Sequence, residues 1–229
     1  MIIEKTPDEI QQSDDIFRNT FSLITAATTQ DKNREIFDRI QIVLKLFKSQ
    51  VVLSPAFFAN SKPTHLTYYI LYGDEIERYI IEPSEVIDFI DFWSKYRKIP
   101  TNNFAVRKFH QLDFRPKLDD RYVDAIIGLE YFFNTDIHEI SYQFRTLGTL
   151  VLGENLPPDK KRKLFQFLRE AYNTRSKLVH GDNSPKIDKS KLTKVRDLLR
   201  DAIKYFYSHD CLDNKTERTD LLNNKLLGI

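Results

Sequence analysis

Apolar side chains recur at helical spacing along much of the chain. The clearest early case is the segment 31–49, where four apolar residues fall at i, i+4, i+7 and i+11, the spacing of one buried helical stripe. A weaker pattern of the same kind covers residues 8–27. We therefore predict an amphipathic helix over 31–49 and a second helix before it. The four stripe residues are Ile36, Ile40, Val43 and Phe47.

The pattern then changes to one that is typical of strands. Residues 66–72 are rich in β-branched and aromatic side chains, the pair Gly73-Asp74 is a turn signal, and residues 76–81 alternate in part between apolar and polar. Together these features predict a small β-hairpin at about 66–82. Pro83 begins another predicted helix. Its apolar face consists of Val86, Phe89, Ile90 and Trp93.

Helical spacing returns after Pro100 and continues almost to the end of the chain. Five predicted helices with short links are typical of an antiparallel bundle. We predict a mainly α chain in three parts: an N-terminal helical region with the hairpin (1–100), a helical bundle (101–209) and a tail or short helix (210–229). The five helices cover about 103–112, 118–133, 138–152, from Pro157 to near Gly181, and 188–207.

Cysteines and long apolar runs are scarce. Cys211 is the single cysteine, so no disulfide can form within the chain, which suits a reducing cytoplasm. The sequence lacks a run of about 18 apolar residues. Its first residues also lack the basic segment and apolar stretch of a secretory signal. We expect a cytoplasmic protein without a membrane span.

The charge is distributed unevenly. The chain has a formal net charge of +2, but residues 155–204 hold 14 Lys and Arg against 6 Asp and Glu, which leaves the remainder at roughly −6. A basic C-terminal half favours a polyanionic partner such as RNA. The alternative interpretation is that these side chains only coat the solvated faces of two helices.

Most signatures of metal, cofactor and nucleophile sites are missing. The six glycines have neither the dinucleotide-binding nor the Walker spacing. There is no Cys/His cluster suited to zinc, no His-Glu-x-x-His and no Gly-x-Ser-x-Gly. We therefore expect no metal and no cofactor.

One segment combines the groups needed for RNA cleavage. An apolar-striped helix ends in Arg175, Ser176, Lys177 and His180, directly before Gly181. Imidazole exchanges protons near neutral pH, and a guanidinium grips a phosphate with two parallel hydrogen bonds. Because the 2′-hydroxyl of RNA is its own nucleophile, the protein need only move protons and neutralise charge at phosphorus.

The spacing of Arg175 and His180 adds a constraint. On a continuous helix, residues five apart point about 140° away from each other. Either the helix ends between them, which Gly181 would permit, or two protomers of a two-fold dimer pool their residues. The structural alternative is that His180 complements the helix dipole and Arg175 pairs with a carboxylate.

The order of residues in 172–181 resembles the element Tyr-x-x-Arg-Ser-x-aliphatic-Val-His-Gly of the Apea-like HEPN domains. Residues 119–130 resemble a second typical segment of that family, and residues 139–145 followed by Leu152-Gly153 resemble the segment between them. An Arg-x4-His element alone is a weak signal, but three segments in order over about 118–207 make a stronger one.

The resemblance implies an HEPN-type helical bundle that dimerises, with the Arg-x4-His elements at the interface. It implies a metal-independent endoribonuclease that leaves 2′,3′-cyclic phosphates, often a toxin or an anti-phage factor with an antitoxin or defence partner. By matching position, His180 would be the acid/base group and Arg175 the phosphate ligand. Ser176 stands where the wider superfamily commonly has Asn, Asp or His. The alternative is an inactive HEPN module for RNA binding or assembly.

Neighbouring residues complete the predicted site. Glu130 lies between apolar neighbours, and we predict a buried structural ion pair between Glu130 and Arg145 of the next helix. The alternative role of Arg145 is a second phosphate ligand. Ser176 and Lys177 are predicted to contact substrate. Tyr172 could line the cleft or stack on a base, although core packing is the favoured interpretation.

Overall fold

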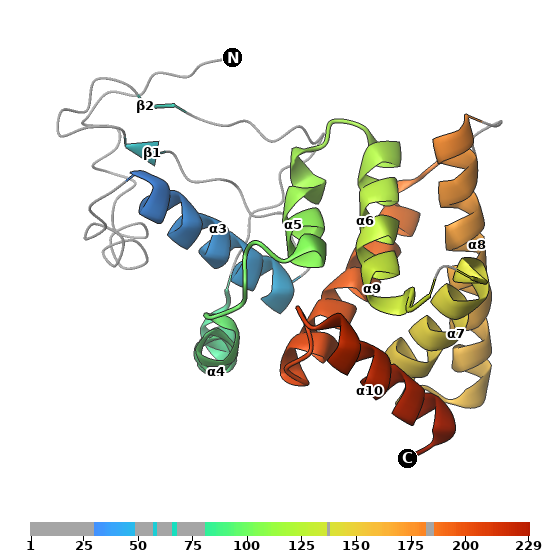
Figure 1. The fold of residues 1–229 in the computed structure, drawn as a ribbon. Helices are drawn as coiled ribbons and strands as arrows, with labels where there is room; N and C mark the ends of the chain where they lie inside the picture. Colours follow the sequence, from blue (N-terminus) through green and yellow to red (C-terminus); the bar gives the residue numbers. More distant parts are fainter. Residues whose placement is uncertain (1–29, 49–56, 59–65, 68–80, 137, 182–185) are drawn as a thin grey trace.

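The computed structural model describes residues 30–48, 57–58, 66–67, 81–136, 138–181 and 186–229. Within these ranges the chain is mainly helical, as predicted (Figure 1). The α-helices are α3 (Gln30–Phe47), α4 (Val86–Tyr96), α5 (Phe104–Gln111), α6 (Leu118–Phe133), α7 (Ile140–Leu152), α8 (Pro158–His180), α9 (Lys189–Ser208) and α10 (Lys215–Leu227). Two short 3-10 helices, η1 (Pro83–Glu85) and η2 (Leu112–Phe114), precede α4 and follow α5.

Local signals account for where several helices begin and end. The side chains of Asn103, Asp188 and Asn214 cap α5, α9 and α10 by accepting hydrogen bonds from first-turn backbone N–H groups. Proline occupies the first position of α8, where its missing N–H costs no hydrogen bond. The predicted short helix at the C-terminus is therefore present as α10.

Only part of the predicted hairpin can be compared with the structure. Strand β2 (Leu66–Thr67) pairs antiparallel with strand β1 (Phe57–Phe58), which precedes it in the chain. The predicted turn and second strand, and the predicted helix over 8–27, lie outside the described residues.

The two longest helices of the C-terminal part both pack on α6. Helix α6 contacts α9 along its length and also contacts α8, while α7 lies along α8 (Figure 1). Gly148 of α7 permits a close approach to α8, because a Cβ there would lie 2.9 Å from a methyl carbon of Leu168. At the centre, the rings of Phe132 and Phe206 stack with centroids 4.7 Å apart.

The C-terminal helix α10 is attached to α6 by a buried arginine. Arg218 is buried, and its guanidinium lies 4.5 Å from the ring centroid of Tyr131. It also donates hydrogen bonds to the carbonyl oxygens of Cys211 and Leu212. Cation–π contact and hydrogen bonds together offset the cost of burying this charge.

Helix α3 shares the hydrophobic core of the bundle. Ile42, Val43 and Leu46 are buried in one cluster with residues of α5, α6 and α9. The predicted boundary at residue 100 stays a prediction, although helices on its two sides contribute to the same core. The predicted apolar face of α4 is only partly right, since Val86 and Ile90 are exposed, while Phe89 packs against Phe47.

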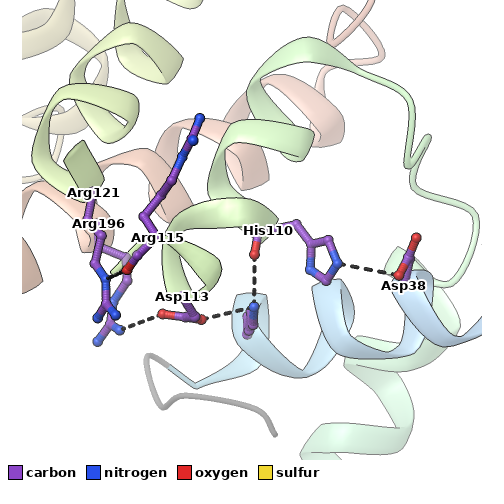
Figure 2. A network of polar contacts seen from close by, with 7 residues as sticks. Asp38, His110, Asp113, Arg115, Arg121 and Arg196 are labelled. Atoms are coloured by element: carbon purple, nitrogen blue, oxygen red, sulfur yellow. Dashed lines mark hydrogen bonds and ion pairs between the residues drawn. The ribbon is translucent and has the colours of Figure 1, made fainter. Parts of the chain in front are cut away.

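A buried ion pair also links α3 to the bundle. The Lys45 ammonium lies 2.9 Å from a carboxylate oxygen of Asp113 and donates a hydrogen bond of 3.0 Å to the carbonyl oxygen of His110. The side chains of Lys45 and Asp113 are only 4% and 8% exposed. Burial lowers the pKa of Lys45, and Asp113 opposes this shift. Figure 2 shows Arg196 approaching the same carboxylate, at 3.9 Å, and His110 facing Asp38.

We predict that the Lys45→Ala variant is less stable than the wild type by about 3 kcal/mol, because the buried carboxylate of Asp113 loses the nearer of its two ion-pair partners and keeps only Arg196, at 3.9 Å. The free energy of unfolding in urea measures the difference. The Glu35→Ala variant is the matched control, since it removes the exposed Arg39–Glu35 ion pair of the same helix and should cost less than about 1 kcal/mol. Equal losses in the two variants would contradict the prediction.

Candidate functional site

The predicted site lies at the C-terminal end of α8. This helix runs without interruption from Pro158 through Arg175 to His180, and Gly181 ends it in the left-handed conformation with φ +73°. The helix therefore does not end between Arg175 and His180. Of the two arrangements that the sequence left open, convergence within one chain by breaking the helix is ruled out by this backbone.

The continuous helix places the two side chains on different faces. Arg175 follows Ala171 by four residues and Leu168 by seven, so it lies on the side of α8 that packs on the bundle. His180 lies about 140° around the helix and about 7.5 Å further along its axis. Its side chain is exposed, as are those of Asn173 and Arg169 on the same side.

Arg175 forms an ion pair with Glu130 of α6. Its Nη2 atom lies 3.5 Å from Oε2 of Glu130, and the two side chains are 25% and 14% exposed. Burial raises the pKa of Glu130, and this effect outweighs the opposing influence of the Arg175 charge. The Nε atom of Arg175 and the Oε1 atom of Glu130 have no hydrogen-bond partner among the described residues. Both atoms are also shielded from solvent, so each of the two groups has hydrogen-bonding capacity that the described residues do not use.

The predicted Glu130–Arg145 pair is wrong: the ion-pair partner of Glu130 in the structure is Arg175. Arg145 of α7 instead lies over two aromatic rings, with its guanidinium carbon 5.5 Å from the centroid of Tyr142 and 5.2 Å from that of Phe165. The physical reason is that α6 packs directly on α8, so a carboxylate near the end of α6 faces α8.

The other predicted residues separate into two groups. Tyr172 is partly buried against the core, with its ring centroid 5.8 Å from that of Phe144, which agrees with core packing. Lys177 is exposed, and Ser176 is half-buried one turn before His180. Ser176 therefore lies on the His180 side of α8, whereas Tyr172 lies nearer to the Arg175 side.

A second polar contact between α6 and α8 was not predicted. Thr174, the neighbour of Arg175, forms a side-chain hydrogen bond with the buried phenol of Tyr122. Burial raises the pKa of Tyr122 to about 12, so this phenol stays protonated at neutral pH and is unsuited to be a general base. Neither this contact nor the partner of Arg175 has a signal in the sequence, because both depend on which helix faces α8.

Neither a metal-binding cluster nor a membrane-spanning helix is present among the described residues. They contain no group of three or more His, Cys, Asp or Glu side chains arranged to hold a metal ion. Likewise, none of their helices combines the length and apolar character that crossing a membrane requires. Comparison of the chain with models of protein families, with curated proteins and with solved structures found no match.

The raised pKa of the partly buried Glu130 carboxyl makes the stability of the protein depend on pH. The folded state binds the Glu130 proton more tightly than the unfolded state, so the wild type loses stability as the pH rises from the ordinary glutamate pKa through the raised pKa. The Glu130→Gln variant lacks this loss. We expect the stability of the variant relative to the wild type to increase across that window and then level off. Urea unfolding at a series of pH values tests this, and a flat or falling difference would contradict it.

Proposed function

We propose that the chain is a metal-independent endoribonuclease that acts as a homodimer of HEPN-type bundles. One observation carries the proposal: α8 ends in an exposed histidine, and five residues earlier the same helix holds an arginine against a partly buried carboxylate. The proposed substrate is single-stranded RNA. The products are a 2′,3′-cyclic phosphate and a 5′-hydroxyl.

The proposed chemistry needs only protons and charge. The 2′-oxygen forms a bond to phosphorus while the bond from phosphorus to the 5′-oxygen breaks. A neutral His180 imidazole accepts the proton of the 2′-hydroxyl, and a protonated imidazole gives a proton to the departing 5′-oxygen. The Arg175 guanidinium neutralises the charge that develops on the phosphate oxygens. Glu130 contacts this guanidinium through Nη2 alone, at 3.5 Å, which leaves the Nη1–H groups for the phosphate.

Helix geometry favours a two-chain site. Side chains that point about 140° apart on one helix do not converge on one phosphate. In a two-fold dimer, the exposed His180 of one chain can approach Arg175 of the other, and the symmetry gives two such sites, each with one imidazole and one guanidinium. The protein has an exposed apolar side chain in this element, Val179, which such an interface would cover.

We predict that the His180→Ala variant loses cleavage of single-stranded RNA by at least about 100-fold, the scale of general acid–base catalysis, while its circular dichroism spectrum is unchanged. His209→Ala is the control, because His209 is exposed at the end of α9 and contacts Tyr205. Cleavage should persist in EDTA. If the wild type leaves diverse single-stranded RNAs intact, or cuts them only when a metal is added, the proposal is wrong.

A mixed dimer tests the sharing of residues. A dimer with Arg175→Ala in one chain and His180→Ala in the other retains one complete site if each site takes its arginine and histidine from different chains. We expect this purified heterodimer to recover about half of the wild-type activity, since one of two symmetric sites is intact. If each site is built from one chain, the heterodimer should be inactive.

An inactive RNA-binding or assembly module is the second candidate. Two observations favour it: Ser176 stands in the position where the wider superfamily commonly has Asn, Asp or His, and Arg175 is engaged by Glu130. Binding of RNA that weakens steeply with salt and yields no product would identify this function. A role as a toxin or in anti-phage defence, with an antitoxin or another partner, is part of the first candidate. For this role, expression of the wild type should inhibit cell growth, and expression of the His180→Ala variant should not.

A further inference from the structure

The exposed face of α8 carries two ordered rows of polar side chains that lead to His180. A seven-residue step on a helix returns to within about 20° of the same direction. Arg162, Arg169 and Ser176 are spaced by seven residues, and Gln166, Asn173 and His180 form a second row with the same spacing. Each residue of the second row follows a residue of the first row by four positions, so the two rows lie next to each other on one face of the helix. We call these six residues the α8 stripe.

The stripe is available to a ligand along its whole length. All of its side chains are exposed except Ser176, which is half-buried. Helix α8 lies at the edge of the molecule in Figure 1, on the opposite side from α4. The stripe spans about 27 Å from Arg162 to His180 at the helical rise of 1.5 Å per residue.

Most basic side chains of α8 form no ion pair with a carboxylate that the structure describes. Helix α8 contains seven Lys and Arg against two Asp and Glu. Helix α9 is also basic, but three of its six Lys and Arg, namely Arg196, Arg200 and Lys204, form ion pairs with aspartates. Arg162 and Arg169 make no ion pair with any carboxylate that the structure describes, and Arg175 is the only basic residue of α8 that does so there.

The chemistry of the stripe fits a nucleic acid backbone. Guanidinium groups bind phosphates, and the amides of Gln166 and Asn173 both donate and accept hydrogen bonds, as ribose hydroxyls do. The stripe contains no aromatic ring on which a base could stack. Contacts of this kind fix the position of a strand and carry little sequence information.

We infer that the α8 stripe is the track that holds single-stranded RNA on one side of the scissile phosphate, with Arg162 and Arg169 each binding a phosphate and His180 at the cleavage end. This inference rests on the proposed function for the role of His180. It assigns to the enzyme an extended substrate of several nucleotides, recognised through its backbone and read with little sequence preference.

The test measures binding without cleavage. The His180→Ala protein is titrated into a fluorescein-labelled oligouridylate of about 15 nucleotides, near the upper site size of single-strand binders, at several KCl concentrations. Adding Arg162→Gln and Arg169→Gln should weaken binding about tenfold and reduce the slope of log K against log[salt] by about 1.4, which corresponds to two phosphate contacts on a single strand. The control pair, Arg97→Gln and Lys98→Gln, makes the same change in charge at exposed residues that follow α4 and should leave binding within about twofold.

The outcomes separate this inference from the proposed function. Three results would show that the α8 stripe does not bind RNA: unchanged affinity in the stripe variant, an equal loss of affinity in the control pair, or no binding of the strand by the His180→Ala protein. Each of these results counts against the stripe whether or not the wild type cleaves RNA. If the stripe variant alone binds weakly, the track stands. In that case an inactive wild type would overturn only the nuclease.

Discussion

The uninterrupted backbone of α8 is the constraint on which the candidate site depends. Because the helix continues to His180 and ends only at Gly181, the directions of Arg175 and His180 are fixed relative to each other by helical geometry. The Cβ directions of the two residues differ by about 140°, so the guanidinium starts on the side of α8 that packs on the bundle and the imidazole on the exposed side. The proposed nuclease therefore requires a dimer, since a single chain supplies the guanidinium and the imidazole on different faces of α8.

The Glu130–Arg175 pair shows how the bundle prepares one of these parts. A guanidinium on a long, flexible side chain loses conformational entropy when it binds a phosphate. The contact with the partly buried carboxylate of Glu130 already restricts this side chain when the protein folds, so less conformational entropy is lost on binding. This is a form of preorganisation. The burial that raises the pKa of Glu130 also weakens its hold on Arg175, because the carboxylate is less readily ionised. A ligand phosphate would therefore compete for the Arg175 guanidinium with a Glu130 carboxylate that binds it only weakly.

The sequence predicts where the helices lie along the chain better than it predicts which helices contact each other. Apolar periodicity predicts α6 at its observed bounds, whereas the sequence leaves open whether α8 ends before His180 or continues to Gly181. The same reasoning predicts a Glu130–Arg145 pair, because Arg145 lies on the next helix along the chain, whereas Glu130 pairs with Arg175 of α8 in the structure. Burial of a charge is equally hard to foresee. Lys45 is a charged residue in the last turn of α3, and only packing against η2 explains its contact with Asp113.

The attachment of α10 bears on when the bundle can form during synthesis. Arg218 covers the rings of Tyr131 and Phe132 on α6, so that end of α6 is not fully packed until the C-terminal helix is in place. A ribosome releases α6 and α8 before it releases α10, and a nascent chain therefore exposes the aromatic surface beside Glu130 until α10 has emerged. The region around the candidate site is then completed only after α10 has been made, so any activity of that site would begin later than the folding of α6 against α8.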